Sequence, residues 1–177
     1  AGAHVTATDT SRNRLRRLES NLNRLKLTAT IAEADVSSWK PAEPFDAILL
    51  DAPCSSTGTV RRHPDISWTK SEADVEKLAG VQRRLLEAAI ELVKPGGRIV
   101  FSNCSLDPAE GEQLAAALLS ERTDIESDPV LADEFPWAVP FVTPEGWLRT
   151  TPADLDLGNP AISGMDGFFA ARFKRRT

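Results

Sequence analysis

Strand-like and helix-like segments alternate along most of the 177 residues, and this alternation constrains the fold more than any other feature. The expected strands cover residues 4–8, 28–34, 45–50 and 98–102, and the expected helices cover residues 12–26, 72–93 and 108–119. Ser11 is a plausible N-cap for the first helix, and Ser71 with Asp74 resembles a capping box for the second. Strands that alternate with helices through short turns predict an α/β fold with a mostly parallel sheet.

Three further segments refine this expectation. Residues 45–50 form an apolar run suited to burial on both faces of the sheet. The Lys-Pro-Gly-Gly segment at 94–97 should end the long helix. Residues 146–150 and 167–173 could pair as late antiparallel strands. The length predicts one domain.

The composition excludes several classes of protein. With 41% hydrophobic and 27% charged residues and a net charge of −5, the chain resembles an ordinary soluble globular protein. No run approaches the ~20 apolar residues of a membrane span, and no leader opens the sequence, so we expect a cytoplasmic location and no membrane partner. Only two cysteines are present, without metal-type spacing, which argues against a disulfide framework and a metal site. No G-x-G-x-x-G loop occurs, which weighs against a dehydrogenase.

Polar residues follow directly after four of the expected strands. They are Asp9, Asp35, Asp51 and the pair Asn103-Cys104. Because ligands of such sheets bind beyond the carboxyl ends of the strands, all of these residues should converge on one edge. Two of them also have ordinary structural interpretations: Asp9 can cap a helix, and Asp35 can form a turn.

Each cysteine lies in a loop of small polar residues that follows a hydrophobic strand. A single cysteine in an intracellular protein is usually a small buried apolar residue. Loops rich in Ser, Thr, Asn, Pro and Gly instead permit thiolate formation. A redox pair is a weaker alternative, because the C-x-x-C spacing is missing. We therefore interpret Cys54 and Cys104 as reactive thiols.

Three segments together resemble the Fmu/Sun (RsmB-type) family of bacterial 16S ribosomal RNA cytosine-5 methyltransferases. They are Asp-Ala-Pro-Cys-Ser-Ser-Thr-Gly at 51–58, Arg-Arg-His-Pro-Asp-Ile-Ser-Trp at 61–68 and Ser-Asn-Cys-Ser-Leu at 102–106. Asp-Gly-Phe-Phe-Ala-Ala at 166–171 is similar to the closing strand of that family. The resemblance covers essentially the whole chain. It implies a Rossmann-like S-adenosylmethionine-dependent methyltransferase domain, with residues 1–177 as the C-terminal catalytic domain.

The resemblance also implies a role for each candidate residue. Cys104 would be the nucleophile that adds to C6 of the cytosine, and Cys54 would help release the methylated product. Asp51 would lie between the cofactor and the base, near N3. Asp9 would hold the ribose of S-adenosylmethionine, and Asp35 would contact its adenine end. No metal is implied.

Basic residues gather in two places despite the negative net charge. The expected helix at 12–26 is rich in arginine, and Arg61, Arg62 and His63 follow the Asp51–Cys54 loop. The second group is the better candidate for contact with RNA phosphates because it lies next to the cysteine loop. A solvated surface is the alternative for both groups.

The sequence also departs from the family. The family's first strand, its glycine-rich cofactor loop and its upstream RNA-binding domain would all precede residue 1. We therefore expect a fragment that is inactive by itself, with ribosomal RNA as substrate and the N-terminal portion, joined or as a separate chain, as partner. Many relatives have Thr where this chain has Asn103; both can hydrogen-bond locally.

Three other functions stay open at this point. A transfer-RNA cytosine-5 methyltransferase would share both cysteine loops. A non-catalytic RNA-binding fragment would keep the fold without the activity. A thiol-redox protein would use the same two cysteines as a disulfide couple.

Overall fold

The structure is a computed structural model that describes residues 2–177. The chain divides into two compact units, Ala1–Ala42 and Glu43–Thr177, and each is described by itself. No helix among residues 2–177 combines the length and the apolar character needed to cross a membrane.

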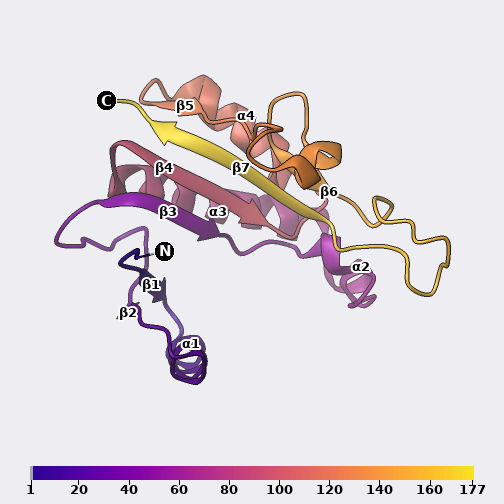
Figure 1. Ribbon diagram of the computed structural model, residues 1–177, viewed down its shortest axis with the longest axis horizontal. Helices are drawn as coiled ribbons and strands as arrows, with labels where there is room; N and C mark the ends of the chain where they lie inside the picture. Colours follow the sequence, from indigo (N-terminus) through magenta and orange to yellow (C-terminus); the bar gives the residue numbers. More distant parts are fainter. Residues whose placement is uncertain (1) are drawn as a thin grey trace. The chain divides into compact units, whose positions relative to one another are not determined.

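The first unit is a strand–helix–strand motif (Figure 1). It contains β1 (Thr6–Asp9), α1 (Arg12–Leu25) and β2 (Thr30–Glu33). The two strands pair in parallel, with Asp9 opposite Glu33. The Ser11 side chain accepts a hydrogen bond from the Arg14 N–H, which confirms the predicted N-cap. Both predicted strands are present. β1 begins two residues later and ends one residue later than predicted, and β2 is shorter than predicted at both ends.

The second unit contains the larger sheet and its helices. Its strands are β3 (Phe45–Asp51), β4 (Val93–Asn103), β5 (Ile125–Ser127), β6 (Leu148–Thr150) and β7 (Phe168–Arg175). Its α-helices are α2 (Ile66–Thr69), α3 (Glu72–Leu92) and α4 (Glu112–Glu121). Short 3-10 helices are η1 (Thr57–Thr59), η2 (Pro108–Glu110) and η3 (Pro136–Phe141).

The sheet of this unit combines parallel and antiparallel pairs in the order β3-β4-β7-β5, with β6 also paired to β7. β3 and β4 run parallel, whereas β7 runs antiparallel to β4, β5 and β6. The α/β class and the late antiparallel pairing of residues 146–150 with 167–173 are confirmed. β5 was not predicted.

The hydrophobic core lies between the sheet and the two long helices, and Figure 1 shows α3 behind β3 and β4. Leu86 and Ile90 of α3, Leu118 of α4 and Phe101 of β4 are all fully buried there. The capping box at Ser71 and Asp74 is present and starts α3 where the sequence predicts.

The prediction that residues 45–50 are buried on both faces is wrong. Ile48 and Leu50 pack against the core, but Leu49 is 72% exposed. Successive side chains of a strand point to opposite faces. In this structure α3 covers only the face of β3 that carries Ile48 and Leu50.

The predicted helix at 108–119 is divided into η2 and α4 at Gly111, whose φ is −128° and ψ −98°. A Cβ atom at this position would lie 2.7 Å from the Arg149 guanidinium and 3.0 Å from the Phe169 ring. The non-helical backbone of Gly111 separates η2 from α4, and its close approach to β6 and β7 leaves no room for a larger side chain there. The predicted strand 98–102 is longer than expected, because β4 already begins at Val93 and bulges at 94–97.

Candidate active site

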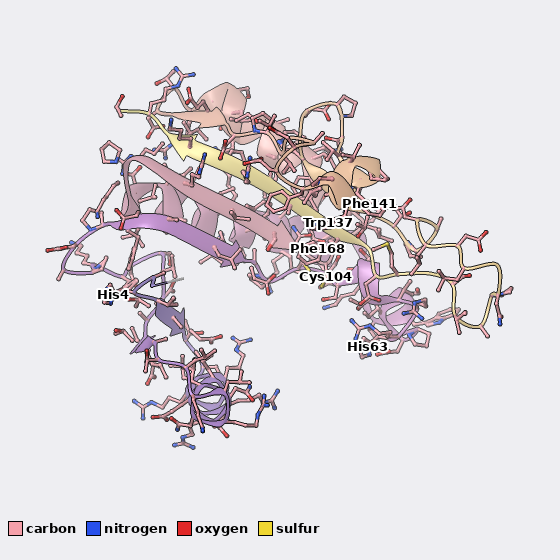
Figure 2. All side chains as sticks on the ribbon, viewed as in Figure 1. His4, His63, Cys104, Trp137, Phe141 and Phe168 are labelled. Atoms are coloured by element: carbon pink, nitrogen blue, oxygen red, sulfur yellow. The ribbon has the colours of Figure 1, made fainter. Side chains whose placement is uncertain are left out.

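The pairing of β3 with β4 brings the two cysteine loops together. Asp51 lies opposite Ser102 at the carboxyl ends of the two strands, and both loops leave the sheet there. The Sγ atoms of Cys54 and Cys104 are 3.6 Å apart, at the sheet end where Figure 2 labels Cys104. Both thiols are free and half-buried. This site therefore offers two thiols in hydrogen-bonding contact that substrate can still reach.

Hydrogen bonding makes the two thiols electrostatically different. The Cys54 thiol donates to Cys104 and, with a smaller contribution from the Ser56 hydroxyl, lowers the pKa of Cys104 to about 6. Burial and the Asp51 carboxylate oppose this shift. The same hydrogen bond to Cys104, together with burial, raises the pKa of Cys54 above its ordinary range. Near neutral pH the site can therefore present Cys104 as a thiolate and Cys54 as a protonated donor.

A tight turn after Cys54 orients the neighbouring hydroxyl group. Ser56 adopts the left-handed conformation, with φ 62° and ψ 21°. Its Oγ lies 3.9 Å from the Cys54 Sγ. A non-glycine residue in this region stores strain of about 1–3 kcal/mol and is often found at functional sites.

Gly58 connects both cysteine loops to the segment before β7. Its N–H donates to the Cys104 carbonyl oxygen at 2.9 Å, and its own carbonyl accepts from the Gly167 N–H at 2.8 Å. A Cβ atom at Gly58 would overlap the Gly167 carbonyl and lie 2.7 Å from the Cys104 carbonyl oxygen. Only glycine allows this approach.

Asn103 and Arg149 hold the second cysteine loop. The Asn103 Oδ1 accepts from the Ser105 N–H at 2.9 Å, so the expected local hydrogen bonding of this side chain is confirmed. Arg149 donates to the Ser105 carbonyl at 2.5 Å and pairs with Glu112 at 2.7 Å. Sequence reasoning missed Arg149 because its partners lie about 40 residues away in the chain.

The predicted RNA-contact residues form an exposed turn between η1 and α2. Arg61, Arg62 and His63 are all exposed, and Figure 2 labels His63 on this turn. The Arg62 Nε donates to the Asp166 Oδ2 at 2.8 Å, and this pairing lowers the pKa of Asp166. Arg61 and His63 add to that effect. A negative charge on Cys104 contributes to the raised pKa of Arg62, which indicates that the turn carries positive charge close to the thiols.

Asp9 and Asp35 lie at the same end of the β1–β2 pair, where the Ala34 N–H donates to the Asp9 carbonyl. The Asp9 Oδ1 accepts from the Ser11 N–H at 2.7 Å, and Oδ2 pairs with Arg14 at 2.8 Å. The Asp35 Oδ1 accepts from the N–H and the hydroxyl of Ser37. The turn contact expected for Asp35 is thus present, whereas Asp9 is not the helix cap, because Ser11 is the N-cap of α1. Carboxylates accept several hydrogen bonds each, so both residues also suit the hydroxyl and amino donors of a nucleoside.

The sequence predicts that the polar residues after the strands lie at one edge of the sheet, and within each unit they do. Asp51 and Cys104 share one strand end in the second unit, and Asp9 and Asp35 share one in the first. The meeting of all four stays a prediction. Within residues 2–177 no group of three or more His, Cys, Asp or Glu side chains could hold a metal ion.

The family described as "16S rRNA methyltransferase RsmB/F" matches residues 1–174. The chain belongs to this family. It is 37% identical over 176 residues to the ribosomal RNA small subunit methyltransferase B of Shewanella oneidensis, covering 98% of this chain and 38% of that relative. The match therefore spans well under half of the relative's length.

Solved structures show the same fold. A methyltransferase homolog protein from Pyrococcus horikoshii has a TM-score of 0.73 and 30% identity, covering 98% of this chain and 53% of that chain. The N-methyltransferase NodS of Bradyrhizobium japonicum, solved with S-adenosyl-L-homocysteine, has a TM-score of 0.51 and 13% identity, covering 98% and 67%. The expected Rossmann-like methyltransferase fold is confirmed.

We expect the alkylation of Cys104 by iodoacetamide to follow its lowered pKa. Because the thiolate is the reactive form, the rate should rise as the pH increases through about 6 and then level off. Replacing Cys54 with Ala removes the donor thiol and should move this transition toward the ordinary cysteine value of about 8.5. Mass spectrometry of the alkylated peptides measures both profiles. An identical profile in the Cys54→Ala variant would contradict the proposed cause of the shift.

Replacing Gly58 with Ala should destabilise the chain by about 1–3 kcal/mol, because the added methyl group has no room between two backbone carbonyls. Gly80 is a matched control, since a Cβ there meets nothing within 4 Å and the residue lies inside α3. Gly80→Ala should instead stabilise the chain by about 0.5–1 kcal/mol. Urea unfolding of both variants measures the difference, and equal effects would show that the approach at Gly58 is unimportant.

Proposed function

We propose that these residues are the catalytic part of a methyltransferase that modifies C5 of a cytosine in 16S ribosomal RNA. The observation that carries the proposal is the contact between Cys104, with its pKa lowered to about 6, and the protonated Cys54. Membership of the 16S rRNA methyltransferase family supports the choice of RNA. Because the chain spans 38% of the Shewanella relative, the activity is assigned to a whole protein that includes these residues.

The chemistry of cytosine explains the need for a thiolate. C5 of cytosine is a poor nucleophile, and addition of the Cys104 sulfur to C6 would make C5 electron-rich, as in covalent catalysis generally. Asp51, at the end of β3, is proposed to donate a proton from its carboxyl group to N3 and so neutralise the negative charge that develops on the ring. S-adenosylmethionine supplies the methyl group when it is bound. Asp9 is proposed to hold its ribose and Asp35 its adenine end.

The second thiol is proposed to act after the first has reacted. The hydrogen bond to Cys104 is the largest cause of the raised pKa of Cys54. Once the Cys104 sulfur is bonded to carbon, it no longer carries a negative charge, so the pKa of Cys54 should fall. Cys54 can then release its own proton to solvent and, as a thiolate, accept the C5 proton. The electrons of the C5–H bond form the C5–C6 double bond, and Cys104 leaves as a thiolate to release the methylated base.

The target base must be unpaired or flipped out, because a stacked base cannot present C6 to a thiol. Arg61, Arg62 and His63 are proposed to hold the flanking phosphates, with Arg62 exchanging its Asp166 partner for phosphate. The cytoplasmic location expected from the sequence agrees with a ribosomal RNA substrate. A transfer RNA substrate would use the same cysteines, but the family match favours ribosomal RNA.

Substitution of each cysteine in the full-length protein tests the covalent mechanism. Cys104→Ala should reduce methyl transfer by roughly 10³-fold or more, since the variant lacks the sulfur proposed to add to C6. Cys54→Ala should instead accumulate a protein–RNA adduct that survives denaturing electrophoresis. Sequencing for 5-methylcytosine in 16S RNA then identifies the base. Turnover retained in Cys104→Ala, or methyl found only on transfer RNA, would reject the assignment.

Neutralising the exposed turn tests the RNA contacts. Arg61→Gln and Arg62→Gln should each weaken the binding of 16S RNA fragments. Each should also reduce the magnitude of the slope of log affinity against log salt concentration by the amount expected for about one lost phosphate contact. Arg84→Gln is the matched control, because Arg84 is an exposed residue of α3 whose guanidinium donates to the Gly80 carbonyl of the same helix. Equal slopes in all three variants would exclude this turn as a phosphate-binding surface.

A further inference from the structure

We propose that Glu110 is a positioning residue that sets the separation of Cys54 and Cys104. The inference rests on the proposed two-cysteine mechanism. Glu110 ends η2 and is completely buried, although a glutamate is rarely buried without strong partners. None of the ion pairs formed within residues 2–177 involves it. Glu110 instead forms hydrogen bonds with residues that precede and follow the two cysteines in the sequence, directly or through one intermediate side chain.

The carboxylate of Glu110 holds the first cysteine loop. Its Oε1 accepts from the Ser55 N–H at 2.9 Å, and its Oε2 accepts from the Ser55 hydroxyl at 2.5 Å. Gln82 donates both to the Glu110 Oε1 and to the Pro53 carbonyl, each at 2.9 Å. The residues before and after Cys54 are therefore bound, directly or through Gln82, to one buried carboxylate.

The main chain of Glu110 holds the second cysteine loop. Its carbonyl accepts from the Asn103 Nδ2 at 2.6 Å, and the Asn103 Oδ1 accepts from the Ser105 N–H. The hydroxyl groups of Ser55 and Ser105 lie 3.1 Å apart and connect the two loops directly. Ser55, Asn103 and Ser105 are completely or almost completely shielded from solvent. The residues before and after Cys104 thus belong to the same network.

This arrangement explains how two unlinked thiols stay 3.6 Å apart. A fully hydrogen-bonded network in a buried environment holds its members rigidly, and removing one member leaves the others unpaired. The lowered pKa of Cys104 depends first on the distance to Cys54. Any change that separates the loops should therefore alter the thiol reactivity as well as the catalytic rate.

Two substitutions distinguish the hydrogen bonds of the Glu110 side chain from its charge. Glu110→Ala removes the acceptor and leaves the Ser55 N–H and the Gln82 amide unpaired. Glu110→Gln removes the charge, but its amide oxygen can still accept from Ser55 and Gln82, and its NH₂ group can donate to the Ser55 hydroxyl. A positioning role therefore predicts damage in the Ala variant and its rescue in the Gln variant.

The test uses the full-length protein and two readouts. Glu110→Ala should lower kcat roughly 10²-fold with little change in KM for RNA, the typical effect of a misplaced catalytic group. The pH profile of Cys104 alkylation by iodoacetamide should move upward toward that of an ordinary thiol. Glu110→Gln should restore most of the rate and a profile near the wild-type one. Glu121→Ala is the control, because Glu121 is an exposed residue of α4 paired with Arg83.

Each outcome decides the inference. Wild-type kcat and alkylation in a folded Glu110→Ala protein would overturn it, and so would equal damage in the Gln and Ala variants. If Glu110→Ala does not fold, Ser55→Ala removes only the hydroxyl that joins the loops and should shift the alkylation profile in the same direction; an unchanged profile would overturn the inference. Shifted alkylation in the Ala variant, with no methyl transfer in the wild type, would support the positioning role and reject the proposed function.

Discussion

The parallel pairing of β3 with β4 is the constraint on which the candidate site depends. It sets Leu50 opposite Phe101 and Asp51 opposite Ser102, so the two cysteine loops start from neighbouring positions on one sheet edge. A register shift of one residue would turn every side chain of β3 to the opposite face. β7 secures the far side of β4, and its first residues lie next to the Gly58–Cys104 contact.

The chemistry of the site follows from small differences around two identical functional groups. Cys54 and Cys104 are similarly accessible, yet their hydrogen bond and the Ser56 hydroxyl favour the negative charge on Cys104. A hydrogen bond to sulfur weakens quickly with distance. The negative charge therefore stays favoured on Cys104 only while the backbone of both loops holds the two thiols at a fixed separation. Buried polar residues provide that geometry, and exposed loop atoms remain available to a substrate. In each loop, buried polar residues thus hold the backbone in place, and the neighbouring cysteine stays accessible for reaction.

The charge distribution is compatible with the RNA contacts that we propose. The net charge is −5, but Arg61, Arg62 and His63 are gathered on one exposed turn. Asp166 neutralises part of this charge through its hydrogen bond with Arg62. Because Arg62 is already bonded to a carboxylate, a new partner must form a stronger contact with the guanidinium to displace it. A phosphate can do so through a bidentate contact. The positive charge of this turn, and not the net charge of the chain, therefore determines whether phosphates are attracted to the site.

Sequence by itself determined features that depend on neighbouring residues: the caps at Ser11 and Ser71, the α/β alternation and the two polar cysteine loops. It also predicted the late antiparallel pairing, from two strand-like segments. The tertiary structure alone decided the exposure of Leu49, the helix break at Gly111 and the burial of Glu110 beneath both loops. The physical reason is the range of the interactions. Caps and periodic patterns arise from residues within about one helical turn of each other, whereas Glu110 meets Ser55 across 55 residues of chain and Cys54 meets Cys104 across 50.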